Sequence, residues 1–292
     1  MKTRLAEIGK TRHAEAWDGA KLLPQGFQAS RGVLAHAPGA APPDVLRWAP
    51  PASLHTCVAY AWRVAWDLSG RPAHTQETAP HPNAYLVLDE GELRVSGVSR
   101  KRFARVLAEK GWAFGVKFRP GGMRAFVPRA MAELTDKVFP VEEIFGVDAV
   151  AFREEMLRTE APETLANMAF CFLERRMGTF DPRVEQANAL VDLILATPAI
   201  RSVEDLARMS GLDVRALQRL FREFVGVSPK WVIRRYRLHE LIARMQGGEE
   251  LYWAALAQEL GYFDQAHLIR DFKMLVGRAP EEYRRATLSP KM

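Results

Sequence analysis

Ser202–Pro229 reads SVEDLARMSGLDVRALQRLFREFVGVSP, and Tyr252–Pro280 reads YWAALAQELGYFDQAHLIRDFKMLVGRAP. The second segment repeats the first at an offset of about fifty residues, and the offset changes by one residue only in the turn of each copy. A repeat whose single insertion falls in a turn indicates repeated structure. The matching residues are Leu206-Ala207, Gly211, Asp213, Leu217, Arg219, Phe221, Gly226 and Pro229, then Leu256-Ala257, Gly261, Asp264, Leu268, Arg270, Phe272, Gly277 and Pro280.

Each copy predicts a short helix, a glycine-containing turn and a second helix. In the first copy, Ser202 with Asp205 forms a capping box that opens the first helix. Gly211 supplies the left-handed residue that ends this helix, and Asp213 caps the next one. The pattern is typical of a helix-turn-helix, which places its second helix in the major groove of DNA.

The second helix of the first copy has two distinct faces. The apolar face carries Val214, Leu217, Phe221 and Phe224. The opposite face contains no acidic residue, although a simply solvated face, the alternative interpretation, usually mixes both charges. Arginine and glutamine can each form paired hydrogen bonds with guanine and adenine edges, so this face predicts base contacts. Its members are Arg215, Gln218, Arg219 and Arg222.

The second copy has a less basic outward face, and we expect it to contribute less to base recognition. Its candidate DNA-binding residues are Gln265, His267, Ile269 and Arg270. Trp231 to Met245 predicts a continuous amphipathic helix between the two copies, with Arg234 and Arg237 away from its apolar face. Arg234 is a candidate contact to phosphate.

Residues 183–286 resemble the DNA-binding domain of the AraC family of bacterial transcription regulators. The resemblance implies base-reading positions at Arg215, Gln218 and Arg219 in the first unit. In the second unit it implies Gln265, Ala266, His267, Ile269 and Arg270, although Ala266 offers no polar group. The motifs that carry it are Leu206-Ala207…Gly211, Leu217-Gln218-Arg219-Leu220-Phe221, Gly226-Val227-Ser228-Pro229, Leu256-Ala257…Gly261-Tyr262, Asp264 to Phe272, Gly277…Pro280 and Tyr283-Arg284.

The N-terminal half more loosely resembles an uncharacterised sensor-type domain found before this module in some family members. Tyr60-Ala61-Trp62 and Gly115 to Gly122 carry that resemblance. Members of the family commonly use this half for effector binding or dimerisation, so the resemblance implies one of those roles. It does not imply a particular ligand.

Alternation of large apolar with small or polar residues predicts strands in the N-terminal half. Strands are expected over 58–68 and 112–118, with a hairpin over 85–95 around an acidic glycine turn. Residues 36–51 predict irregular chain, and Ser99 is expected to cap a short helix containing Phe103, Val106 and Leu107. The aromatic strands suggest a small sheet or barrel. Candidate residues for a ligand pocket, with core packing as the alternative, are Trp62, Trp66, Tyr85 and Phe118.

The sequence offers no residues for catalysis. The histidines of the N-terminal half lack the spacing of a metal site, and no nucleotide-binding glycine motif is present. Cys57 and Cys171 lie far apart and outside any CxxC pair, which argues against a thiolate zinc site and a disulfide scaffold. We therefore expect no enzyme activity, no metal and no cofactor.

Composition is that of an ordinary globular protein: 292 residues, 48% hydrophobic and 26% charged. The net charge of +6 favours an anionic partner. Met1 to Trp17 lacks the apolar core of a secretory signal, and no apolar run has membrane-spanning length. We expect a soluble, cytoplasmic protein.

Together these patterns predict an α+β chain. A β-rich sensor or dimerisation domain spans 1–139, a helical connector 140–182, and an all-α DNA-binding domain 183–286. Within the last, the first helix-turn-helix covers about 202–225, the linker helix about 229–246 and the second unit about 252–276. Expected partners are double-stranded DNA, a small-molecule effector, RNA polymerase and a second copy bound through 1–182. The alternative function is a ligand-binding or enzymatic barrel with the DNA-binding module as its output.

Overall fold

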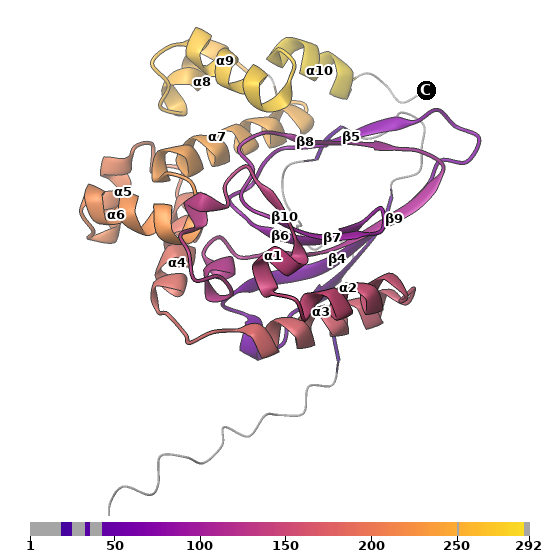
Figure 1. The fold of residues 1–292 in the computed structure, drawn as a ribbon. Helices are drawn as coiled ribbons and strands as arrows, with labels where there is room; N and C mark the ends of the chain where they lie inside the picture. The colour runs from indigo at the N-terminus through magenta and orange to yellow at the C-terminus, as the bar shows by residue number, and fades with distance from the viewer. Residues whose placement is uncertain (1–18, 25–32, 36–42, 250, 289–292) are drawn as a thin grey trace, which may run out of the picture.

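The computed structural model describes residues 19–24, 33–35, 43–249 and 251–288. Strands fill the first half of the described chain and helices fill the second. The predicted α+β class, with a β-rich N-terminal part and a helical C-terminal part, is therefore confirmed (Figure 1).

Two antiparallel sheets form the N-terminal half. The larger sheet has the strand order β1-β3-β4-β9-β6-β7-β10, and the smaller has the order β2-β5-β8. The large-sheet strands are β1 Lys21–Leu22, β3 Asp44–Ala49, β4 Val58–Asp67, β6 Tyr85–Asp89, β7 Glu92–Ser96, β9 Lys110–Phe118 and β10 Val138–Pro140. The small-sheet strands are β2 Val33–Ala35, β5 His74–Thr78 and β8 Phe103–Leu107.

The strands over 58–67 and 110–118 and the hairpin β6–β7 confirm the sequence prediction. Glu90 and Gly91 both have positive φ, 49° and 76°, as a tight two-residue hairpin turn requires. The expected helix after Ser99 is wrong, because Phe103–Leu107 is the strand β8, paired with β5 along its whole length. Of the segment predicted to be irregular, 36–42 lies outside the described residues, whereas Asp44–Ala49 is a sheet strand paired with β4.

Helices cover one face of the large sheet (Figure 1). They are α1 Val141–Phe145, α2 Ala149–Leu157 and α3 Pro162–Arg176, of which α3 contacts β4 and β9. Phe114 and Val116 of the sheet and Phe170 and Leu173 of α3 belong to one continuous buried cluster. The segment expected to act as a connector thus supplies the cover of the sheet. Short 3-10 turns lie at η1 Ala52–Leu54, η2 Gly122–Ala125 and η3 Met131–Glu133.

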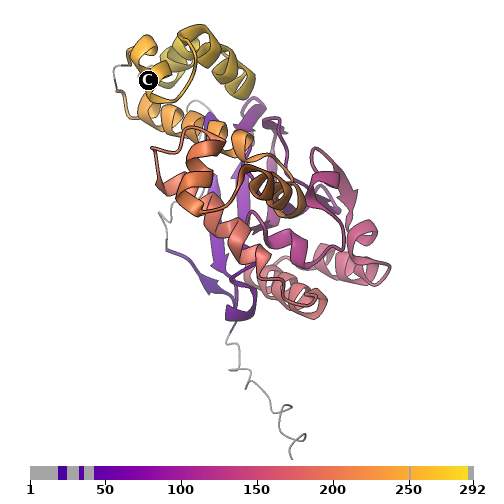
Figure 2. The same ribbon diagram turned by 90° about the vertical axis from the view of Figure 1, so that its left-hand side faces the viewer.

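The C-terminal helices form two groups on either side of a long helix. In both views α8–α10 lie on one side of α7, and α4–α6 lie on its other side, toward the sheet (Figures 1 and 2). The helix α7 joins two cores, because Val232 and Ile233 belong to the main cluster and Leu241 and Met245 to a second one. The elements are α4 Arg183–Ala196, α5 Val203–Ser210, α6 Val214–Leu220, the π-helical turn η4 Phe221–Val225, α7 Pro229–Gln246, α8 Trp253–Glu259, α9 Gln265–Val276 and α10 Pro280–Leu288.

The small sheet contacts the second helical group. Leu34 of β2 and Ala79, just after β5, are buried in the same cluster as Leu268 and Phe272 of α9. Arg102 donates a hydrogen bond of 3.0 Å to the carbonyl of Val276, at the end of α9. Across the described part of the chain, no helix is both long and apolar enough to cross a membrane.

Candidate nucleic-acid interface

The first helix-turn-helix is built by the capping residues that the sequence predicts. The hydroxyl of Ser202 accepts from the Asp205 N–H at 3.0 Å, and the Asp205 carboxylate accepts from the Ser202 N–H at 3.1 Å. A further hydrogen bond from the Arg201 N–H is the main cause that holds the pKa of Asp205 below its usual range. Gly211 ends α5 with a φ of 73°, and Asp213 caps α6 by accepting from the Ala216 N–H at 2.7 Å.

The predicted base-reading face of α6 is exposed to solvent. Arg215, Gln218 and Arg219 are exposed on α6, and Arg222 is exposed in η4. Within the described residues, none of these three arginines forms an ion pair with a carboxylate, whereas Arg208 on the preceding helix pairs with Asp205. The face is therefore an uncompensated cationic surface, and its guanidinium groups are available to an anion.

The opposite face of α6 and η4 anchors the first unit to the N-terminal half. Leu217, Phe221 and Phe224 are completely buried. After η4, Gly226 adopts a φ of 94°, and its carbonyl accepts a hydrogen bond of 2.7 Å from the Thr135 hydroxyl, just beyond η3. The guanidinium of Arg124 in η2 lies over the ring of Phe224, 5.6 Å from its centroid. The helix α6 is thus held against the sheet domain.

The second unit exposes fewer of its predicted DNA-binding residues. Asp264 caps α9 by accepting from the His267 N–H at 2.7 Å, and Gln265 and Arg270 are exposed. His267 and Ile269 are half-buried. His267 Nε2 lies 3.1 Å from a guanidinium nitrogen of Arg234 on α7, so this histidine connects two helices of the same domain.

The structure places Arg234 and Arg237 in roles that the sequence analysis missed. Arg234, expected to meet phosphate, pairs with Asp271 of α9, and the Tyr262 hydroxyl donates to the same carboxylate at 3.1 Å. Arg237, expected at the surface, is buried and donates to the carbonyl groups of Thr197 and Ile200, at 2.7 and 3.0 Å. Asp271, an acidic residue on α9, was the sequence signal that could have indicated the ion pair of Arg234. The linker helix is therefore tied to the second unit and to the segment between α4 and α5.

The four candidate pocket residues of the N-terminal half do not lie together. Trp62, Trp66 and Tyr85 share the sheet face that α3 does not cover, as the strand register shows. Phe118 points to the opposite face, where it is fully buried and its ring lies 5.5 Å from that of Phe126. Phe118 therefore belongs to the helix-covered core.

Metal and thiol chemistry depend on possible metal ligands and on the two cysteines within the described ranges. No group of three or more His, Cys, Asp or Glu side chains there could hold a metal ion. Both cysteines are free, and burial is the main cause that raises the pKa of Cys57 to about 11, so that thiol is a poor nucleophile at neutral pH.

Comparison with known families separates the two halves of the chain. Residues 206–286 match a family model described as a helix-turn-helix domain. Residues 46–140 match one described as a domain of unknown function, DUF6597. The chain is also similar to YkgA of Escherichia coli (strain K12), named as an HTH-type transcriptional regulator, with 36% identity over 85 residues. That match covers 28% of this chain and 34% of the relative, about a third of the relative's length.

Two solved structures share a more distant likeness. ToxT from Vibrio cholerae is 12% identical, with a TM-score of 0.39 over 75% of this chain and 99% of that one. The C-terminal domain of AraT, a response regulator from Geobacillus stearothermophilus, is 21% identical, with a TM-score of 0.31 over 37% and 88% of the two chains. Since both TM-scores are below 0.5, these structures support no conclusion about this chain. The family match over 206–286 and the two capped helix-turn-helix units agree, and this part of the chain is a helix-turn-helix domain.

Proposed function

We propose that this protein is a transcription regulator that binds double-stranded DNA in a sequence-specific manner through two helix-turn-helix units. The observation that carries the proposal is the acid-free face of α6, whose arginines have no carboxylate partner within the described part of the chain. Unpaired guanidinium groups on a helix that is free to enter the major groove favour contact with base edges and phosphates. The helix-turn-helix family match supports the same function.

The exposed residues are expected to make different kinds of contact with DNA. Arg215 lies in the first turn of α6, and Gln218 and Arg219 follow one turn later on the same face. The N-terminal residues of this helix contact base edges in the helix-turn-helix motif. Arg222 lies further along, in η4, where a phosphate contact is expected. In the second unit, Gln265 and Arg270 are the candidate contacts to DNA. His267 and Ile269 are half-buried, and His267 also contacts Arg234 of α7.

The N-terminal half, within the proposed boundaries 1–139 and 140–182, is the candidate regulatory part. An effector that binds there, a second copy bound through 1–182 and RNA polymerase are its proposed partners. The contacts from Thr135 and Arg102 to the two units support such a role, because each connects the sheet domain to a DNA-binding element. The proposal assigns no catalytic residue.

Selection of bound fragments from genomic DNA by the purified protein tests the function and yields an operator. Arg219→Ala should then weaken operator binding by about 1–3 kcal/mol and relax the preference at one base pair. Arg208→Ala is the matched control, since it removes the same charge from α5 of the same unit. Equal binding of all fragments, or an Arg219→Ala variant that keeps the affinity and base preference of the original, would contradict the proposal.

A further inference from the structure

Lys117, on β9, is a buried cation without an acidic partner. Lys117 is only 8% exposed to solvent. Its ammonium group lies 5.6 Å from the centroid of the Tyr60 ring, and no carboxylate in the described part of the chain pairs with it. Burial, and then the charge of Arg47, lower the pKa of Lys117 to about 8. A charge that is buried without an acidic partner destabilises the folded protein unless an anion compensates it.

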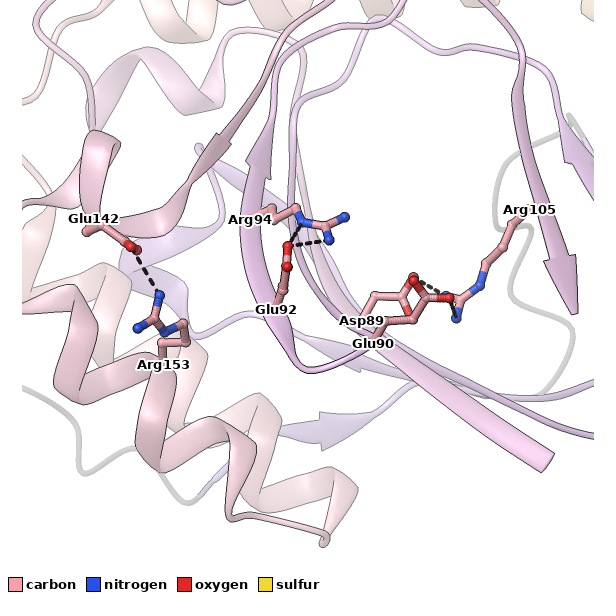
Figure 3. A network of polar contacts seen from close by, with 7 residues as sticks. All are labelled: Asp89, Glu90, Glu92, Arg94, Arg105, Glu142 and Arg153. Atoms are coloured by element: carbon pink, nitrogen blue, oxygen red, sulfur yellow. Dashed lines mark hydrogen bonds and ion pairs between the residues drawn. The ribbon is translucent and has the colours of Figure 1, made fainter. Parts of the chain in front are cut away.

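Other cations of the same half have such compensation. Figure 3 shows Arg94 paired with Glu92, Arg105 with Asp89 and Glu90, and Arg153 with Glu142. Arg105 also lies over the ring of Trp66. In contrast, the side chains of Lys117 and Arg47 have no acidic partner within the described ranges. The two uncompensated cations are close enough for the charge of one to affect the other.

Aromatic side chains surround this pair of cations. The strand register places Tyr60 and Tyr85 directly opposite Lys117 on its two neighbouring strands. It also places Trp62 opposite Gly115 on one side and Arg47 on the other, so all six residues share one face of the sheet. The indole of Trp62 lies over Gly115, where a β-carbon would come within 2.6 Å of it. Flat aromatic surfaces therefore border the unpaired positive charges.

The linker helix of the DNA-binding domain adjoins the same group. Burial raises the pKa of Tyr85, and the neighbouring tyrosines Tyr60 and Tyr236 add to that shift. Tyr236 lies on α7, and its ring is 6.1 Å from that of His239. His239 in turn contacts the carbonyl of Pro80 at 3.1 Å, just after the small-sheet strand β5. The cations and aromatic rings thus lie where the sheet domain meets α7.

We propose that Lys117 and Arg47 bind the carboxylate of a small aromatic acid, whose ring lies against Trp62 and the tyrosines Tyr60 and Tyr85. Two cations without an acidic partner match one carboxylate, and stacking on flat rings favours an aromatic body over a flexible or sugar-like one. The inference rests on the proposed regulator function, for which it names the class of effector. It also accounts for a lysine that the fold alone leaves destabilising.

The test uses the full chain without DNA and measures binding by calorimetry and by quenching of tryptophan fluorescence. The probes are phenylacetate and indole-3-acetate, each compared with its neutral amide. Because a charge-assisted contact is lost in the amides, at least one acid should bind about 10- to 100-fold more tightly than its amide. Lys117→Met should abolish that preference. Lys110→Met, the same change at an exposed position of the same strand, should leave it intact.

Three outcomes would overturn the inference. These are no binding by either acid, equal binding of acid and amide, and unchanged acid binding in Lys117→Met. If Lys117→Met does not fold, Arg47→Met takes its place with the same expectation of a reduced preference for the acid. Since DNA is absent from these measurements, a failure here leaves the DNA-binding proposal standing. If the protein fails to bind an operator, a positive result for acid binding remains valid in the same way.

Discussion

The guanidinium of Arg234, on the linker helix α7, forms an ion pair with the carboxylate of Asp271, on α9. Asp271 also accepts from the Tyr262 hydroxyl, and His267 contacts the same arginine. The Arg234 guanidinium further lies over the Tyr262 ring, 5.7 Å from its centroid. Four side chains from α7, α9 and the turn between α8 and α9 therefore set the orientation of α9.

Replacing Arg234 with alanine should disturb the second unit without removing a phosphate contact. We expect lower thermal stability and weaker operator binding, because the partly buried Asp271 loses its cationic partner. The slope of log affinity against log salt should stay the same, because the number of phosphate contacts does not change. Titrations of the operator at several salt concentrations measure this. A slope that falls by about one, with stability unchanged, would restore the phosphate role instead.

Local signals in the sequence were enough to place the helix-turn-helix units. Ser202, Asp205 and Asp213 act through hydrogen bonds to residues at most four positions away, so their roles follow from spacing alone. The left-handed turn at Gly211 is local in the same way. For this reason the capping box, the turn and both second helices agree with their prediction.

Non-local pairing explains most of what the sequence did not reveal. Phe103, Val106 and Leu107 have a helix-like spacing, but β8 forms because β5 offers a complete antiparallel edge about thirty residues earlier. Arg234 and Arg237 appear as surface residues on a helical wheel, and only the packing of α7 against α9 and α4 supplies their partners. Phe118 was grouped with Trp62 by residue type, although the register puts them on opposite faces.

The first unit should contribute more to operator affinity than the second. Its exposed face has three arginines without an acidic partner among the described residues, whereas α9 exposes Gln265 and Arg270. The double variant Arg215→Ala/Arg219→Ala should therefore lose more affinity than Gln265→Ala/Arg270→Ala, each lost base contact costing about 1–3 kcal/mol. Fluorescence anisotropy with the selected operator compares the two. The reverse order of losses would show that α9 dominates recognition.

Two left-handed glycines of the first unit should respond differently to alanine. At Gly211, with a φ of 73°, a β-carbon meets nothing within 4 Å, so the cost is backbone strain of about 1–2 kcal/mol. At Gly226, with a φ of 94°, a β-carbon would also lie 2.9 Å from the Met131 carbonyl oxygen and from the Thr135 hydroxyl. Gly226→Ala should therefore destabilise the protein more than Gly211→Ala in urea denaturation. Equal losses of stability in the two variants would mean that Met131 and Thr135 leave room for a β-carbon at position 226.

Lys117 makes the stability of the unliganded protein depend on pH in a specific window. Its folded-state pKa is about 8, below the ordinary value of 10.5. Below pH 8 the lysine is charged in both states, so the full cost of burial, up to about 3 kcal/mol, is present. Between about pH 8 and 10.5 the unfolded chain binds a proton that the folded protein does not, and the folded state gains stability as pH rises. Lys117→Met should thus be more stable than the original at pH 7, and the difference should shrink at pH 10.

Urea denaturation at the two pH values gives the free energies for this comparison. Taking the difference between the variant and the original removes the contribution of titrating groups that lie far from Lys117. Tyr60 and Tyr85 lie beside Lys117, so their coupling to its charge is part of the measured difference. Lys110→Met supplies the control, because Lys110 is exposed and pairs with Asp67 at the surface. Its effect should be small at both pH values. A Lys117→Met difference that is the same at pH 7 and pH 10 would mean that Lys117 is compensated in the folded protein, and the anion proposed to bind there would lose its physical basis.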